Sequence, residues 1–163
     1  MKMAHTIMAL VQDKPGVLNR IASMFRRRGF NISSLSVGHS EVPGISRMTI
    51  VVAGDDATLE QATKQLRKLI EVQKVFSPPE ESLVARELVL IKVTATPSNR
   101  IEIIPIVDIF RGNVIDVGDN SLIIEVTGDE DKITSMIEIL DKFGVEEIMR
   151  SGRLAMSRGD DIS

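Results

Sequence analysis

The sequence of 163 residues contains no cysteine, no tryptophan and no tyrosine, and only two histidines. Without cysteine there can be no disulfide framework, no thiolate metal site and no thiol nucleophile. Aromatic residues make up 3% of the chain, too few for a sheet that stacks RNA bases on exposed aromatic side chains. These absences exclude redox, thiol-dependent and base-stacking functions.

Long hydrophobic runs are also absent. No stretch of about 18 apolar residues occurs, so the sequence predicts no membrane-spanning helix. The first residues lack the small-residue cleavage site of a secretory signal. A hydrophobic fraction of 43% beside 26% charged residues is typical of a globular fold. We therefore expect a soluble, cytoplasmic protein.

Catalytic motifs are missing as well. A Ser or Thr nucleophile needs a histidine base, but His5 and His39 each lie in a predicted strand, with only Glu41 close to His39. No cluster with metal-ligand spacing, no Walker loop and no GxGxxG motif is present. The sequence predicts no catalytic residues, no metal site and no cofactor bound by this chain.

Charge is distributed unevenly along the chain. Residues 1–80 hold 11 Lys and Arg against 7 Asp and Glu, whereas residues 81–163 hold 9 against 16. The overall net charge of −3 argues against a dedicated nucleic-acid binder. The one basic cluster, Arg26-Arg27-Arg28, ends a predicted helix, where cations favour the helix dipole. The change of sign between the halves indicates two structural units.

The break between these units is a short polar segment with two consecutive prolines, Pro78 and Pro79. Such a pair can neither continue a helix nor lie in a central strand. We predict a first domain at 1–78, a linker at 79–86 and a second domain at 87–163.

Apolar periodicity predicts the same order of elements in both halves: strand, helix, strand, strand, helix, strand. This is the split βαβ arrangement of ferredoxin-like folds, so we predict an α+β protein of two tandem ferredoxin-like (βαββαβ) domains. The predicted strands are 5–11, 31–40, 45–53, 72–76, 88–94, 114–117, 122–126 and part of 145–156. The predicted helical core positions are Val17, Ile21, Met24 and Phe25; Leu59, Ala62, Leu66 and Leu69; Ile101, Ile104, Val107 and Phe110; and Ile133, Met136, Ile137 and Leu140.

Two features depart from a simple ferredoxin-like pattern. Pro105 lies inside the third predicted helix, where proline costs about 3 kcal/mol, so we expect a kink or a late helix start. The first strand is apolar on both faces, although helices cover only one face of such a sheet. Together with the exposed pattern of residues 32–37, this suggests oligomerisation through the sheet, or packing of the two halves against each other.

The loop after the first strand, Asp13-Lys14-Pro15-Gly16-Val17, has the properties of an anion site. Backbone amides at the start of a helix point into the gap and suit a carboxylate. The Asp13 side chain can hold an ammonium group, so the loop matches both ends of an α-amino acid. The alternative is an ordinary helix start without a ligand.

Several motifs resemble one known family. In the first half they are Asp13-Lys14-Pro15-Gly16-Val17-Leu18 and Arg28-Gly29-Phe30-Asn31-Ile32, which resemble the ACT domain, a ferredoxin-like module that binds amino acids. Together with Phe110-Arg111-Gly112, Glu125-Val126-Thr127-Gly128 and the ending Arg150 to Gly159, they resemble the small, regulatory subunit of acetolactate synthase. The resemblance extends over almost the whole chain.

This resemblance implies a non-catalytic partner of a thiamine-diphosphate enzyme in valine, leucine and isoleucine biosynthesis. The family's small subunit activates the catalytic (large) subunit, which carries thiamine diphosphate, Mg and FAD, and confers feedback inhibition by a branched-chain amino acid, usually valine. It implies a homodimer through the ACT domains, with no nucleic acid or membrane partner. The alternative is a free-standing ACT sensor that controls another enzyme or a transcription factor.

The resemblance also implies an effector site at the dimer interface. The amides of Gly16 and Val17 would receive the carboxylate of valine, and Asp13 of the same loop would lie beside them. Asn31 and Ile32 of the facing protomer would complete the site. Some family members have Asn at position 13, so Asp13 leaves ligand selectivity open.

Overall fold

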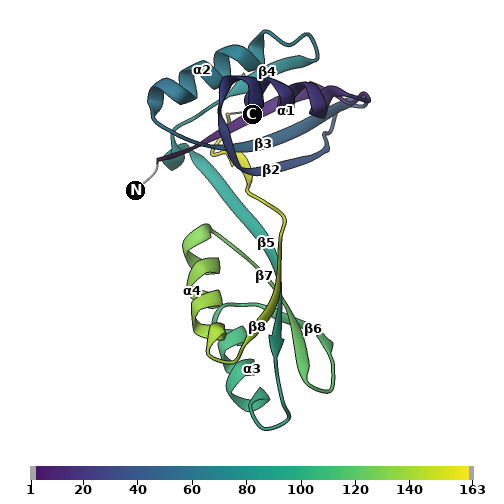
Figure 1. The fold of residues 1–163 in the computed structure, drawn as a ribbon, viewed down its shortest axis with the longest axis vertical. Coiled ribbons are helices and arrows are strands. Elements are labelled where there is room, and N and C mark those ends of the chain that lie inside the picture. The colour runs from purple at the N-terminus through teal and green to yellow at the C-terminus, as the bar shows by residue number, and fades with distance from the viewer. Residues whose placement is uncertain (1–2, 162–163) are drawn as a thin grey trace. The chain divides into compact units, whose positions relative to one another are not determined.

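The computed structural model describes residues 3–161 of the chain. They form two compact units (Figure 1). The first contains the chain up to Val84 together with the segment from Arg153, and the second contains Ala85–Gly152. Each unit has an antiparallel sheet with two helices, so the prediction of two tandem ferredoxin-like domains is confirmed.

The first unit follows the predicted order of elements, with strand order β2-β3-β1-β4 in its sheet. Both helices cover one face of this sheet (Figure 1). The elements are β1 (Ala4–Gln12), α1 (Val17–Arg28), β2 (Asn31–His39), β3 (Ile45–Ala53), α2 (Asp56–Arg67), β4 (Val72–Phe76), the 3₁₀ turn η1 (Glu80–Ser82) and β9 (Leu154–Ser157).

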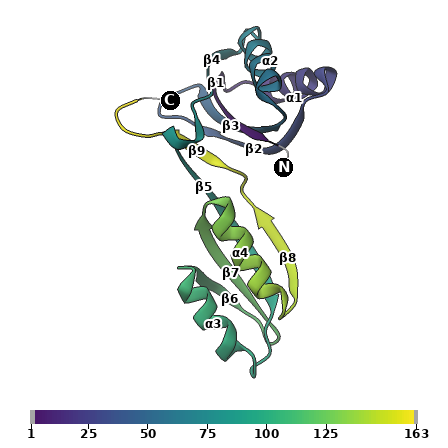
Figure 2. The same cartoon turned by 90° about the vertical axis from the view of Figure 1, so that its left-hand side faces the viewer.

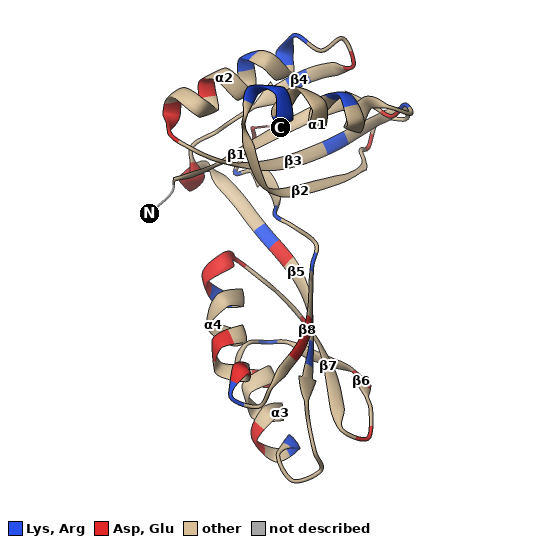
Figure 3. Ribbon diagram, in the orientation of Figure 1, with Lys and Arg blue, Asp and Glu red and all other residues tan. Residues whose placement is uncertain are grey.

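Helix α1 forms because its apolar residues recur at helical spacing and pack on the sheet. The four predicted core residues of this helix, Val17, Ile21, Met24 and Phe25, are all buried. Gly29 ends the helix with a φ of 69°, a left-handed conformation that glycine adopts without strain. The three arginines before it are exposed at the basic end of α1 (Figure 3).

The second face of the first sheet is covered by the chain itself. Met8 is 0% exposed although the register of β1 directs it away from the helices. Strand β9, which pairs with the start of β5 (Leu83–Thr94), lies on this face (Figure 2). Leu83 of β5 and Ala155 of β9 are both buried. This packing explains why β1 is apolar on both faces.

A polar cluster attaches the carboxy-terminal segment to this face. The Arg153 guanidinium donates to Thr6 Oγ1 at 2.5 Å and to both Glu80 carboxylate oxygens at 3.0 and 3.1 Å. Thr6 Oγ1 in turn donates to Glu80 at 2.9 Å, and the Arg153 backbone N–H donates to Ser34 Oγ at 2.8 Å. One side chain thus joins the segment to β1 and to η1.

Arg153→Ala is expected to destabilise the first unit by roughly 1–3 kcal/mol, because Thr6 and Glu80 lose their shared charged donor. Urea unfolding followed by circular dichroism measures this loss. Arg158→Ala is the matched control: Arg158 is exposed and bonds to Ser82 O through its backbone N–H, so its effect should stay within about 0.5 kcal/mol. Equal stabilities of the two variants would contradict the assigned role of Arg153.

The second unit repeats the topology, with the path β6-β7-β5-β8 in its sheet. Its two helices lie on one face of the sheet (Figure 2). Besides the rest of β5, its elements are α3 (Arg100–Ile109), β6 (Asn113–Val117), β7 (Ser121–Gly128), α4 (Glu130–Asp141) and β8 (Val145–Arg150). The last predicted strand is therefore two strands, β8 and β9, with Gly152 between them at a φ of 81°.

The prediction of which α3 residues face the core was partly wrong. Ile103 and Val107 are buried, whereas Ile101 is 77% exposed and Ile104 is 44% exposed. The helix is apolar on almost every side, so periodicity could not select the inner face. The helix also starts at Arg100 and continues through Pro105, rather than starting late.

The two units do not divide the chain where the predicted ranges do. The ranges 1–78, 79–86 and 87–163 place the last residues with the second domain, whereas in the structure the segment from Arg153 belongs to the first unit. The physical reason is the Arg153 cluster and the burial of Ala155. As independently folding domains, the ranges stay a prediction.

Candidate functional site

The β1–α1 loop is held in a defined conformation by backbone bonds. The Gln12 N–H donates to Glu71 O at 2.8 Å, and the Asp13 N–H donates to Gly44 O at 2.9 Å. Gly16 has a φ of 86°, and a Cβ at this position would meet nothing within 4 Å. Glycine adopts this left-handed conformation without strain, and the space beside it is open.

The start of α1 has no side-chain cap, unlike the starts of α2 and α4. Asp55 accepts from the Thr58 N–H, and Asp129 accepts from the Lys132 N–H, each at 2.9 Å. The bond from the Thr58 N–H lowers the pKa of Asp55 below its ordinary value. At α1 the cap residue is Gly16, which has no side chain, and no acidic residue lies in the first turn. The positive end of this helix dipole is therefore open to an external anion.

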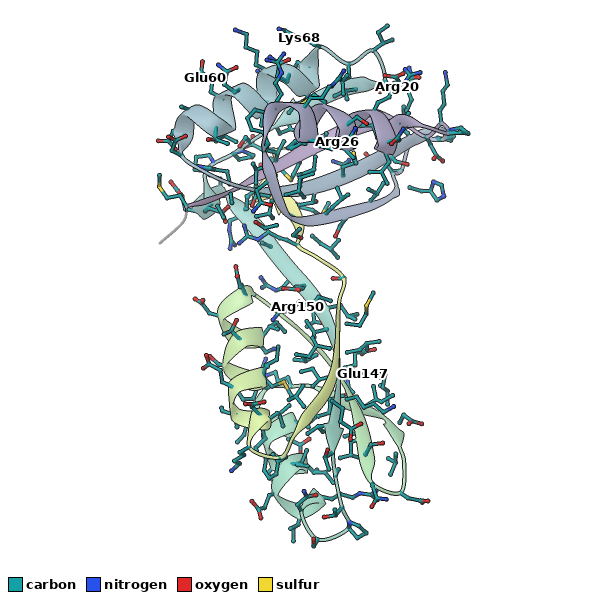
Figure 4. All side chains as sticks on the ribbon, in the orientation of Figure 1. Arg20, Arg26, Glu60, Lys68, Glu147 and Arg150 are labelled. Carbon is teal, nitrogen blue, oxygen red and sulfur yellow. The ribbon has the colours of Figure 1, made fainter. Side chains whose placement is uncertain are left out.

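Two side chains at this helix start, those of Val17 and Arg20, are already engaged within the domain. The Val17 N–H makes a long bond of 3.4 Å to Lys14 O, and the Val17 side chain is only 6% exposed, within the core. Val17 can therefore offer its amide rather than its side chain to a ligand. Arg20, labelled on α1 in Figure 4, forms an ion pair with Glu71, so its charge is already partly compensated.

Asp13 pairs with a residue that sequence reasoning did not place in the site. His39 Nδ1 lies 3.1 Å from Asp13 Oδ2, and these side chains are 85% and 46% exposed. Glu41, the neighbour considered as an acid–base companion of His39, instead binds Arg47 at 2.9 Å. A backbone bond, aided by Arg47, lowers the pKa of Glu41. Alternation along the strand directs His39 to the helix face, but only the sheet order shows that it reaches Asp13.

The remaining predicted site residues, Asn31 and Ile32, lie at the other end of the sheet. Gln12 pairs with Ile45, whereas Asn31 pairs with Ala53 at the opposite end of β3. These two ends are eight residue steps apart along β3, or about 27 Å. One chain therefore brings Asp13, Gly16 and Val17 together and keeps Asn31 and Ile32 away from them.

Strand β2 forms an edge of the first sheet and has free backbone donors. The Ser40 N–H bonds to Ile45 O at 2.9 Å, which sets the alternation of the antiparallel ladder. By this alternation the N–H groups of Leu35, Val37 and His39 point away from β3, toward the free edge. Such an edge can pair with a second strand.

The fold and this loop define a class of protein: a small α+β chain with an amino-terminal ACT domain and a second ferredoxin-like unit. Residues 7–74 match the ACT domain of acetohydroxyacid synthase small subunits, and residues 86–159 match the small subunit of acetolactate synthase. The chain belongs to the family of acetolactate synthase small subunits.

Individual relatives match this chain over almost its whole length. A probable acetolactate synthase small subunit of Archaeoglobus fulgidus is 55% identical over 97% of this chain and 99% of its own. An acetolactate synthase small subunit of Mycobacterium bovis is 52% identical over 95% and 92%. The crystal structure of the small subunit from Thermotoga maritima superposes with a TM-score of 0.90 at 48% identity, covering 98% of this chain and 99% of that one.

Within residues 3–161, no group of three or more His, Asp or Glu side chains could hold a metal ion. No helix of the described residues is long and apolar enough to cross a membrane.

Proposed function

We propose that this chain is the regulatory subunit of an acetolactate synthase. It raises the activity of the thiamine-diphosphate catalytic subunit and makes that activity sensitive to a branched-chain amino acid, with valine as the leading effector. Chemistry, together with thiamine diphosphate, Mg and FAD, belongs to the catalytic subunit. Family membership supports the partner, and the β1–α1 loop supports the effector.

The single observation that carries the effector proposal is the division of the site between the two ends of one sheet. Antiparallel pairing of β2 with β2 of a second copy, about a two-fold axis near Leu35, reverses the partner strand. This symmetric pairing brings Asn31 of the partner subunit to the end where His39 and Asp13 lie. A homodimer through the ACT domains therefore assembles what a single chain keeps about 27 Å apart.

The assembled site suits a valine zwitterion. The open helix start at Gly16 and Val17 receives the carboxylate, and Asp13 receives the ammonium group. Asn31 of the partner subunit supplies a neutral hydrogen-bonding side chain. Ile32 packs partly against its own core and presents its remaining surface to the aliphatic side chain of the ligand.

A free-standing ACT sensor is the weaker reading, because the second unit also matches the acetolactate synthase small subunit, over residues 86–159. The deciding experiment mixes a purified catalytic subunit with this chain, with and without valine. Acetolactate formation should rise on adding the chain, and valine should lower it only when the chain is present. No rise in acetolactate would end the proposal.

Asn31→Ala is expected to weaken valine binding by roughly 1–3 kcal/mol, because one hydrogen bond to the ligand in the interface is lost. Calorimetric titration of the dimer with valine measures the change. Asn19→Ala is a suitable control, since Asn19 is exposed on α1, and it should bind valine like the unmodified chain. Unchanged affinity in Asn31→Ala would remove this residue from the site.

A further inference from the structure

We propose that His39 is a further residue of the effector site, and that its imidazolium competes with the effector's ammonium group for Asp13. The inference rests on the proposed effector function and adds a specific residue to it. It starts from the 3.1 Å contact between His39 Nδ1 and Asp13 Oδ2.

The contact is made across the sheet rather than along the chain. His39 pairs with Ser46 on β3, and Gln12, directly before Asp13, pairs with Ile45 of the same strand. His39 thus ends β2 and Asp13 directly follows β1, two strands that flank β3, at the same end of the sheet. The Asp13 backbone is fixed by its bond to Gly44 O, so its carboxylate is held within reach of the imidazole.

Most other charged side chains near His39 and Asp13 already form ion pairs of their own. Glu41 in the β2–β3 turn is bound to Arg47 of β3 at 2.9 Å, and Glu71 beside the loop is bound to Arg20 of α1. Lys14 adds one exposed cation next to Asp13. Asp13 is therefore the carboxylate that His39 contacts, and it is also the proposed receptor of the effector's ammonium group.

The charge of the His39 imidazole sets the direction in which pH should change valine binding. Histidine side chains change charge between about pH 5 and 8, while the ammonium and carboxylate groups of valine stay charged over that range. An imidazolium at His39 compensates the charge of Asp13 and repels a second cation placed beside it. Valine should therefore bind more weakly at pH 6 than at pH 8, by about three- to tenfold for two cations roughly 6 Å apart in a solvated site.

The chain makes this pH dependence traceable. The chain has only two histidines. The other one, His5, pairs with Val52 near the opposite end of β1, and its side chain lies 3.7 Å from Asp56. His39→Gln removes the imidazole and keeps a polar side chain. His5→Gln is the matched control.

The experiment is calorimetric titration of valine into the full-length protein at pH 6 and pH 8, in two buffers of different ionisation enthalpy. The unmodified chain and His5→Gln should bind more weakly at pH 6 and release protons on binding near neutral pH. His39→Gln should bind with nearly equal affinity at both pH values and release fewer protons. The same pH dependence and proton release in His39→Gln as in the unmodified chain would overturn the role of His39 alone. No binding of valine, leucine or isoleucine by the unmodified chain at either pH would overturn the effector assignment, and the role of His39 with it.

Discussion

Gly16→Asp is expected to abolish feedback inhibition by valine while activation of the catalytic subunit persists at least in part. Gly16 is the cap residue of α1, in a left-handed conformation with open space where a side chain would begin. Aspartate tolerates this conformation better than most residues and is a favoured helix cap. Its carboxylate would therefore accept hydrogen bonds from the backbone amides that the ligand's carboxylate needs. It would also repel the ligand's carboxylate.

The expected size of this effect is large. Each hydrogen bond to a charged group contributes about 1.5–3 kcal/mol, so losing two of them raises the valine concentration for half-inhibition at least about 100-fold. Inhibition assays on the reconstituted enzyme and calorimetry on the free chain measure it independently. Gly16→Asn, similar in size and in backbone tolerance but neutral, should weaken binding less. Binding by Gly16→Asp that equals the unmodified chain would sink the site assignment, whatever the fate of the proposed partner.

Val37→Pro is expected to convert the dimer into a monomer and to remove valine binding with it. The Val37 N–H points to the free edge of β2, so proline removes a donor toward the second copy and leaves the bonds to β3 in place. Val37 is also 48% exposed in the single chain, so the change costs little packing. We expect the dimer dissociation constant to rise by at least about 100-fold, because the proline blocks the strand pairing on both sides of the two-fold axis.

Sedimentation at micromolar concentration measures the mass of the Val37→Pro protein, and circular dichroism shows whether it is folded. Val37→Thr keeps the N–H and the branched side chain, so it should remain a dimer that binds valine. A folded Val37→Pro protein that is still a dimer would place the interface elsewhere. A folded monomer that binds valine normally would contradict a site shared between two chains.

The core of each unit was largely predictable from periodicity. In α1, the spacing of Val17, Ile21 and Phe25 selects one inner face, and all three are buried. The prediction failed at α3, where isoleucine occupies inner and outer positions alike and Ile101 is exposed. A pattern identifies the inner face only where polar residues mark the outer one.

Local patterns in the sequence specify the order of the elements, the two sheets and the loop that presents Gly16, because these depend on periodicity and on backbone conformation. Which distant residues meet depends instead on how the strands are arranged in the folded chain. The pairing of His39 with Asp13, and the attachment of Arg153 to Thr6, depend on strand order and register. The separation of Asn31 from Asp13 also follows from strand order and register. Strands β1 and β2 both run antiparallel to β3, so the residue after the end of β1 and the first residue of β2 lie at opposite ends of the sheet.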